Sequence, residues 1–211
     1  NFVFGTYNAG ITVFEESSKI DYSSGNSNIV DNTVWAIRKD NEGRLWLGTS
    51  RGLTVMNPDG TLEKAPYEIG NPKVRTLEWA NQNTLLLGGD MGLMVCTKDS
   101  IYTIDSLNIN KLIKLGDKVY CGASNGLFVF DREGDFTEYE QIELPENKVF
   151  TLTSDFKNNL WIGTENGLFV RFPTGNIMRM VLQQGVYRSK NIQGLITTSD
   201  SSIWVSSMKG V

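Results

Sequence analysis

One short phrase recurs six times along this chain at nearly constant spacing. The two clearest copies are Leu45-Trp-Leu-Gly-Thr-Ser-Arg-Gly-Leu53 and Leu160-Trp-Ile-Gly-Thr-Glu-Asn-Gly-Leu168, and weaker copies begin at Phe2, Leu85, Val119 and Ile203. The second glycine of each copy lies at position 10, 52, 92, 126, 167 or 210, so that successive glycines are 42, 40, 34, 41 and 43 residues apart. A period of roughly 40 residues is typical both of β-propeller blades and of helical-pair repeats, so the local pattern must decide between them.

The residues between 34 and 66 indicate that the repeating unit consists of strands. Four short runs suited to strands, 34–37, 45–47, 53–56 and 61–64, alternate with turns rich in Asp, Asn, Gly and Pro. These residues favour tight turns because they tolerate or fix the backbone angles that turns need. No window of about 11 residues keeps apolar side chains at helical spacing. The sequence therefore predicts an all-β fold, a β-propeller of four-stranded antiparallel blades.

We expect the whole chain, residues 1–211, to form one β-propeller region. Complete blades are predicted at 34–66, 74–104, 112–142 and 149–181, with partial blades at 1–23 and 192–211. Both partial blades contain a second strand, so they overlap instead of completing each other. An open arc of blades would expose apolar faces of a kind that soluble proteins avoid. We therefore expect the chain to be an excerpt of a larger ring of about six to eight blades, with seven as the expected number.

The residues that recur in the phrase are interpreted as structural. Trp46, Trp161 and Trp204 occupy one position of the repeat, where an aromatic side chain is expected to pack in the core. The recurring glycines are expected to permit a tight hairpin between the second and third strands. They are Gly48, Gly52, Gly92, Gly126, Gly163, Gly167 and Gly210.

The composition excludes several classes of function for this segment. The net charge is −4 and the basic residues do not cluster, so no nucleic acid is expected as a partner. No run of about 18 apolar residues exists, so no membrane insertion by this segment is expected. Histidine is absent, which removes histidine bases and most zinc sites. We expect no catalytic residue, metal or cofactor, and we interpret Cys96 and Cys121 as free buried thiols.

Residues that differ between the repeats are the candidates for ligand contact. A rigid repeat scaffold presents its specific contacts on loops and strand ends that vary from one repeat to the next. Trp35 and Tyr187 could stack on a sugar ring, and Arg51, Arg75, Arg188 and Lys209 could meet an acidic ligand such as a sulfated or uronic sugar. Arginine suits such groups because its planar fork binds two oxygens. The ordinary alternative for each is an exposed side chain without a partner.

Two segments of this chain closely resemble the two-component regulator propeller repeat. They are Asp40-Asn-Glu-Gly-Arg-Leu-Trp-Leu-Gly-Thr-Ser-Arg-Gly-Leu53 and Asp155-Phe-Lys-Asn-Asn-Leu-Trp-Ile-Gly-Thr-Glu-Asn-Gly-Leu168. The pattern of that repeat is Asp-x-x-Gly-x-Leu-Trp-Ile-Gly-Thr-x-x-Gly-Leu. The resemblance implies the periplasmic sensor region of a hybrid histidine kinase of the Bacteroidetes, anchored in the inner membrane. In that family two propellers of seven blades each typically precede an immunoglobulin-like domain, a membrane helix and the kinase.

The resemblance implies a non-catalytic module that recognises an oligosaccharide and relays a signal to a histidine kinase. The expected partners are an oligosaccharide or similar small ligand, neighbouring sensor domains of the same chain and, as an open alternative, a second copy in a homodimer. Two other functions stay open. One is a scaffold for docking proteins, and the other is a propeller lyase, which the absence of histidine disfavours because lyases generally use a His or Tyr base.

Overall fold

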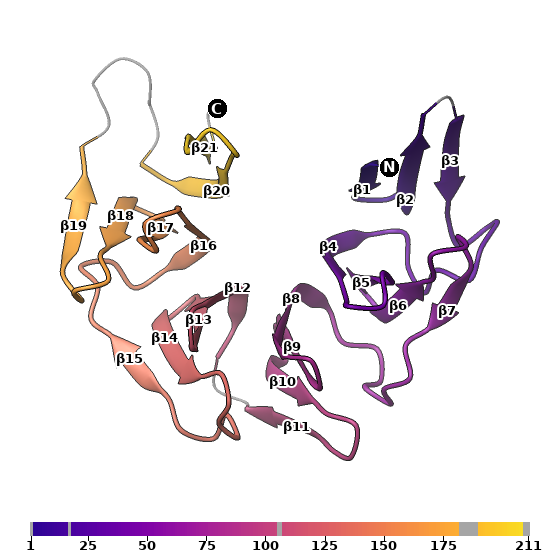
Figure 1. Ribbon diagram of the computed structural model, residues 1–211, viewed down its shortest axis with the longest axis horizontal. Helices are drawn as coiled ribbons and strands as arrows, with labels where there is room; N and C mark the ends of the chain where they lie inside the picture. The colour runs from indigo at the N-terminus through magenta and orange to yellow at the C-terminus, as the bar shows by residue number, and fades with distance from the viewer. Residues whose placement is uncertain (1, 17, 105–106, 182–189, 209–211) are drawn as a thin grey trace. The chain divides into compact units, whose positions relative to one another are not determined.

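The computed structural model describes residues 2–16, 18–104, 107–181 and 190–208, and strands are the regular structure found in them. The strands form six antiparallel sheets in which sequence neighbours are hydrogen-bonded neighbours (Figure 1). The chain divides into two compact units, Asn1–Ser106 and Leu107–Val211, which are described separately below. Within the described part, no helix has the length and apolarity that crossing a membrane would require.

The first unit contains three sheets. A three-stranded sheet comprises β1 (Phe2–Gly5), β2 (Ile11–Glu15) and β3 (Ser18–Tyr22). The next sheet comprises β4 (Val34–Lys39), β5 (Leu45–Thr49), β6 (Gly52–Met56) and β7 (Leu62–Lys64), and the third comprises β8 (Val74–Asn81), β9 (Thr84–Gly89), β10 (Gly92–Cys96) and β11 (Ile101–Ile104).

The second unit also contains three sheets. The first comprises β12 (Ile109–Leu115), β13 (Lys118–Ala123), β14 (Gly126–Asp131) and β15 (Glu140–Ile142). The second comprises β16 (Val149–Ser154), β17 (Leu160–Thr164), β18 (Gly167–Arg171) and β19 (Ile177–Met180), and the two-stranded third comprises β20 (Ile192–Thr197) and β21 (Ile203–Ser207). The expected all-β fold with four-stranded antiparallel blades is confirmed, and β12 begins at Ile109 instead of Leu112.

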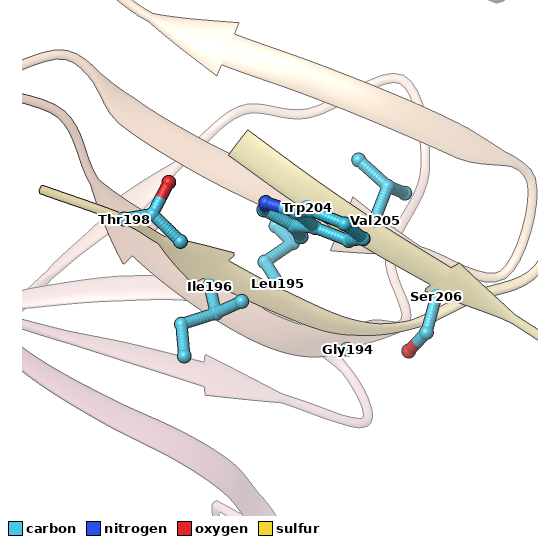
Figure 2. Close-up of a pocket in the computed structure, with 7 residues that line it drawn as sticks. All are labelled: Gly194, Leu195, Ile196, Thr198, Trp204, Val205 and Ser206. Carbon is cyan, nitrogen blue, oxygen red and sulfur yellow. The ribbon is translucent and has the colours of Figure 1, made fainter. Parts of the chain in front are cut away.

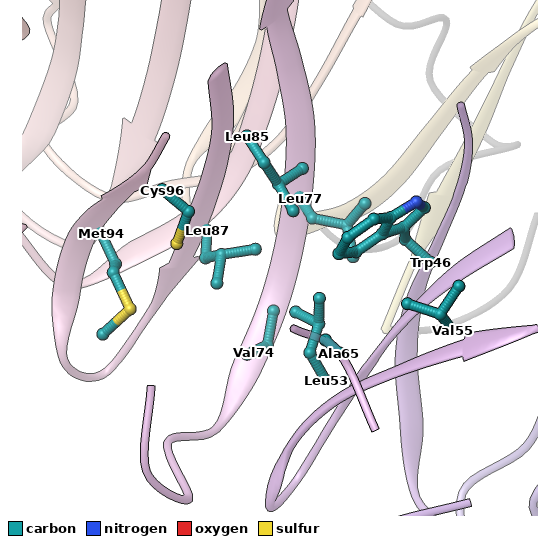
Figure 3. Close-up of a cluster of buried hydrophobic side chains, with 10 residues drawn as sticks. All are labelled: Trp46, Leu53, Val55, Ala65, Val74, Leu77, Leu85, Leu87, Met94 and Cys96. Carbon is teal, nitrogen blue, oxygen red and sulfur yellow. The ribbon is translucent and has the colours of Figure 1, made fainter. Parts of the chain in front are cut away.

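The core lies between neighbouring sheets, which explains why the middle strands are apolar at consecutive positions. Trp46, Leu53 and Val55 of the β4–β7 sheet pack against the β8–β11 sheet, where Val74 and Leu87 are buried (Figure 3). Both faces of β6 are buried along its whole length. A strand that is covered on both faces shows no alternation of polar and apolar residues, as the sequence displays.

The two glycines of each phrase have different roles. The second glycine serves the hairpin, because Gly52 and Gly92 have positive φ angles of 114° and 94°. The first serves packing: a Cβ on Gly48 would lie 2.8 Å from Val74 Cγ1 of the next sheet, and a Cβ on Gly163 would lie 2.7 Å from Ile192 Cγ2. The expectation that both glycines serve the hairpin is therefore wrong for Gly48 and Gly163.

The outermost faces of the first and last sheets are apolar and exposed. Phe2, Phe4 and Phe14 lie on the face of the β1–β3 sheet that contacts no other sheet in its unit, and all three are exposed. Their counterparts in the β4–β7 sheet include Leu47, which is fully buried. On the last sheet Trp204 is 56% exposed, whereas Trp46 at the same position of the repeat is 2% exposed. Core packing of this tryptophan therefore holds for Trp46, and not for Trp204 within the described part of the chain.

Candidate functional site

Five of the sheets share one irregularity: a β-bulge at the beginning of their first strand. In β4 the register shifts between Val34 and Ala36, so that Trp35 has no partner in the ladder with β5. The same shift occurs in β8, β12, β16 and β20. The bulge residues are Trp35, Arg75, Asn110, Phe150 and Gln193. A bulge redirects one side chain out of the regular alternation, and such features are frequent beside functional sites.

The bulges lie next to the hairpins between the second and third strands. Val34, just before the bulge, pairs with Thr49 at the end of β5, and the β5–β6 hairpin follows at once. Bulge and hairpin residues also contact each other, as when Trp35 Nε1 donates a hydrogen bond to Ser50 Oγ at 2.9 Å. Two positions that vary between the repeats, the bulge and the hairpin tip, therefore lie together in each of the five sheets that contain a bulge.

In the first unit, Trp35 contacts side chains from its own sheet and from the two neighbouring sheets. Its ring makes an edge-to-face contact with Tyr7 of the β1–β2 hairpin, with centroids 5.9 Å apart and planes at 87°. Lys73, which precedes β8, places its Nζ 4.2 Å from the Trp35 ring centroid. Trp35 remains 40% exposed and Tyr7 70% exposed. The group formed by Tyr7, Trp35 and Lys73 is called the Trp35 platform below.

The two arginines of the first unit that were expected to meet an acidic ligand each have a carboxylate partner. Arg75 Nη1 lies 2.5 Å from Asp90 Oδ1 on the β9–β10 hairpin. Arg51 Nε lies 3.7 Å from Asp31 Oδ2 and its side chain is mostly exposed. The charge of Arg75 is thus balanced by a close partner, whereas the exposed pair of Arg51 and Asp31 is weaker.

In the second unit, the bulge residues make a different set of contacts. Asn110 Nδ2 donates to the Val149 carbonyl oxygen at 2.8 Å, which ties the first strands of two sheets together. Lys148 Nζ lies 5.2 Å from the Phe150 ring centroid and 3.5 Å from Glu165 Oε1. Gln193 is exposed. One scaffold position therefore carries an aromatic, a cationic or an amide side chain, depending on the sheet.

The structure groups some of the predicted ligand residues and leaves others untested. Trp35 and Arg75 occupy equivalent bulges in the first unit, and Arg51 lies on a hairpin of the same unit. Tyr187, Arg188, Lys209 and Gly210 lie outside the described residues.

Two residues of the candidate site escaped the sequence analysis. Asn110 was missed because the blade was expected to start at Leu112, although a β-branched residue precedes every bulge (Val34, Val74, Ile109, Val149 and Ile192) and could have revealed it. Lys73 was missed because its contact with Trp35 joins two different sheets, which no local pattern reports.

An apolar pocket of about 380 Å³ lies on the last sheet, lined by β20 and β21 (Figure 2). Trp204, Ile196 and Val205 line it, and Trp204 stands at the position that Trp46 fills between two sheets. In the other sheets, residues at such positions pack against a neighbouring sheet. The pocket is therefore explained as a blade face that no described sheet covers. It is therefore not the candidate ligand site.

The described residues offer little reactive chemistry. Among them no three His, Cys, Asp or Glu side chains are grouped closely enough to hold a metal ion. Cys96 and Cys121 are free and buried, as expected. Burial raises the pKa of Cys96 to about 12 and also raises the pKa of Cys121, so both stay protonated and unreactive near neutral pH.

The repeats match a known family model. Residues 28–51 and 143–166 match the two component regulator propeller family, and each matched segment contains a first strand with its bulge. The chain thus carries two-component regulator propeller repeats. No curated protein sequence matches the chain.

Solved structures with the same fold come from proteins of different function. The extracellular domain of a hybrid two component system from B. thetaiotaomicron has a TM-score of 0.83 and 18% identity, and the match covers 97% of this chain and 30% of that one. PorZ, a surface component of the type-IX secretion system of Porphyromonas gingivalis, has a TM-score of 0.77 and 17% identity over 99% of this chain and 36% of that one. This chain thus spans about a third of the length of both proteins.

A third similar structure belongs to an enzyme. It is a catalytically inactive histidine-to-alanine variant of virginiamycin B lyase from Staphylococcus aureus, with quinupristin. Its TM-score is 0.65 with 16% identity, over 83% of this chain and 63% of that one. At such identities the likeness shows the fold, and function must be argued from the site.

Proposed function

We propose, from the two-component regulator propeller repeats that this chain carries, that it is part of the ligand-sensing propeller of a hybrid two-component system. In this proposal it lies in the periplasm as part of an inner-membrane sensor, within a ring of about six to eight blades. It recognises an oligosaccharide and has no catalytic activity of its own. Ligand binding biases the packing of the neighbouring sensor domains, and the signal passes to a histidine kinase.

The array of bulges is the observation that carries this proposal. The bulge position beside the hairpin carries Trp35 and Arg75 in two sheets of the first unit, and Asn110, Phe150 and Gln193 in the three sheets of the second unit. Aromatic rings suit the apolar faces of sugars, while amide and guanidinium groups suit their hydroxyls and acidic groups. A scaffold that varies only these positions can be adapted to different ligands without disturbing its core.

A sensor can respond only to the extent that its ligand prefers one packing of the domains over another. Rigidly held contact residues favour such a preference, because little binding energy is lost in ordering them. Trp35 is held by three partners, which fits this requirement.

Two other functions have some support from the similar structures. The lyase is inactivated by losing one histidine, and this chain contains no histidine, so the likeness to that enzyme does not extend to its chemistry. PorZ is a component of a secretion system, which favours a protein-docking role as the second candidate. A docking scaffold would bind a protein, and not a free oligosaccharide, with the same bulge and hairpin residues.

The test is a binding screen of the purified 211-residue chain against an oligosaccharide array, followed by calorimetry of the hits. Phe150→Ala and Phe156→Ala form a matched pair, because Phe150 is a bulge residue and Phe156 is an exposed residue past the other end of β16. We expect Phe150→Ala to weaken binding about tenfold and Phe156→Ala to leave it unchanged. If no oligosaccharide binds, the proposed ligand class is wrong.

A further inference from the structure

We propose that the Trp35 platform is a subsite for an acidic sugar residue, with Lys73 binding its carboxylate or sulfate group and Tyr7 stacking on its ring. This inference rests on the proposed function, because it names the ligand class of the same face. It uses only residues of the first unit. One of them, Lys73, was not among the residues expected to bind a ligand.

Lys73 lies against an aromatic ring, whereas each of the two neighbouring arginines lies against a carboxylate. Arg75 is paired with Asp90 at 2.5 Å and Arg51 with Asp31 at 3.7 Å. The described contact of Lys73 is instead the face of the Trp35 ring, at 4.2 Å. A cation–π contact leaves the charge of the ammonium group in place, so an anion can still bind to its remaining N–H donors.

The platform is preorganised by the backbone around it. Thr33 Oγ1 donates to the Tyr7 carbonyl oxygen at 2.5 Å, and the Val34 N–H donates to the Thr6 carbonyl oxygen at 2.9 Å. These bonds fix the β1–β2 hairpin against the start of β4. The Trp35 indole is anchored through Ser50. A ligand would therefore meet rings that are already in place, which lowers the entropic cost of binding.

The backbone of Lys73 lies close to Gly89, at a position where the other repeats have no glycine. A Cβ on Gly89 would lie only 2.0 Å from the Lys73 carbonyl oxygen, so no other residue fits there without a shift of the backbone. The equivalent positions of the other sheets are Thr6, Thr49, Ala123, Thr164 and Ser207. The sheet that supplies Lys73 is thus the one that has a glycine at this point.

Exposure and chemistry fit an acidic sugar better than a neutral one or a bare anion. Tyr7 is 70% exposed and presents an aromatic ring on which the apolar face of a pyranose can stack. A bare anion would gain nothing from that ring, and a neutral sugar would gain little from the lysine. A uronic or sulfated residue satisfies both groups at once.

The experiment compares two forms of one ligand by calorimetry with the 211-residue chain. The probes are glucuronic-acid-containing oligosaccharides and the same oligosaccharides after carboxyl reduction, which turns each uronate into a neutral sugar. We expect the acidic form to bind about ten- to a hundredfold more tightly, because hydrogen bonds to charged groups contribute that much. The preference should shrink at high salt.

Variants identify the residue responsible. Lys73→Gln should abolish the preference for the acidic form, and Lys73→Arg should keep it. Lys39→Gln is the matched control, since Lys39 is an exposed lysine at the opposite end of β4 from the bulge. This variant should prefer the acidic form as strongly as the parent chain does. Tyr7→Ala should weaken the acidic and the neutral forms to the same extent.

The outcomes separate this inference from the function on which it rests. Equal binding of both forms, or an unchanged preference in Lys73→Gln, would overturn the acidic subsite and leave oligosaccharide sensing standing. If neither form nor any other oligosaccharide binds, both proposals are wrong.

Discussion

Asp155 Oδ2 accepts a hydrogen bond from Trp161 Nε1 at 2.9 Å, across the turn that joins the first and second strands of its sheet. Asp40 and Trp46 repeat this bond at 2.8 Å in the other clear copy of the phrase. The other oxygen, Asp155 Oδ1, accepts the backbone N–H groups of Lys157 and Asn159. One carboxylate therefore closes the turn and fixes the indole that packs between sheets.

Asp155→Ala should destabilise the fold by about 3 kcal/mol, because it leaves the Trp161 N–H and two backbone N–H groups without their acceptor. The measurement is the free energy of unfolding from urea titration. Asp99→Ala, at an exposed aspartate in the β10–β11 turn, is the control and should change stability by less than about 0.5 kcal/mol. Equal effects of the two substitutions would contradict the role of this carboxylate.

The same carboxylates should make the fold sensitive to acid. Burial alone would raise the pKa of Asp155, but hydrogen bonds from Trp161, Asn159 and the backbone outweigh it and the pKa is lowered. Asp40 shows the same balance: burial would raise its pKa, but bonds from Trp46 and Arg44 lower it. A carboxyl group whose pKa is lower in the folded chain contributes stability above its unfolded pKa of about 4. That contribution is lost as the pH falls through the folded pKa.

The measurement is a series of urea titrations between about pH 7 and pH 2 on the parent chain and on Asp155→Asn. The parent should be more stable near neutral pH, and the difference should shrink below about pH 4 as the parent carboxylate becomes protonated. A difference that stays constant over this range would show that the charge of Asp155 contributes nothing.

The repeat phrase predicted the sheets correctly because each strand carries its own apolar residues and each turn its own turn residues. The order β4-β5-β6-β7 follows from hairpins alone, and these are local. The contacts between sheets were harder to predict. The sequence suggested that Gly48 serves the hairpin, although what requires a glycine there is the close approach of Val74 from the next sheet.

The candidate site was predicted in part for the same reason. Trp35 and Arg75 stand out in the sequence because they vary where the repeat is otherwise constant. The partners that set their roles, Lys73 for Trp35 and Asp90 for Arg75, are revealed only by the structure. Such pairings depend on side-chain placement, which the spacing of the repeats does not encode.

The tryptophans of the phrase should differ in their contribution to stability. Trp46→Ala should cost about 3–5 kcal/mol, since this buried ring packs against Trp79 and Tyr67 at 5.4 and 5.8 Å between centroids. Trp204→Ala, at the same repeat position on an uncovered face, should cost less than about 1 kcal/mol. Thermal and urea unfolding of both variants test this, and similar losses would mean that Trp204 is covered in solution.

Packing of neighbouring sheets should also depend on the first glycine of the phrase. Gly163→Ala places a Cβ 2.6 Å from Thr151 Cγ2 and 2.7 Å from Ile192 Cγ2, which forces β20 away from β17. We expect a loss of about 1–3 kcal/mol in the free energy of unfolding, as is usual for overpacking. Gly25→Ala is the matched control, because a Cβ there would meet only Ser23 Oγ at 3.8 Å. If both substitutions leave stability unchanged, the sheets pack less closely than the structure indicates, whereas a loss confined to Gly163→Ala supports close packing as the role of this glycine.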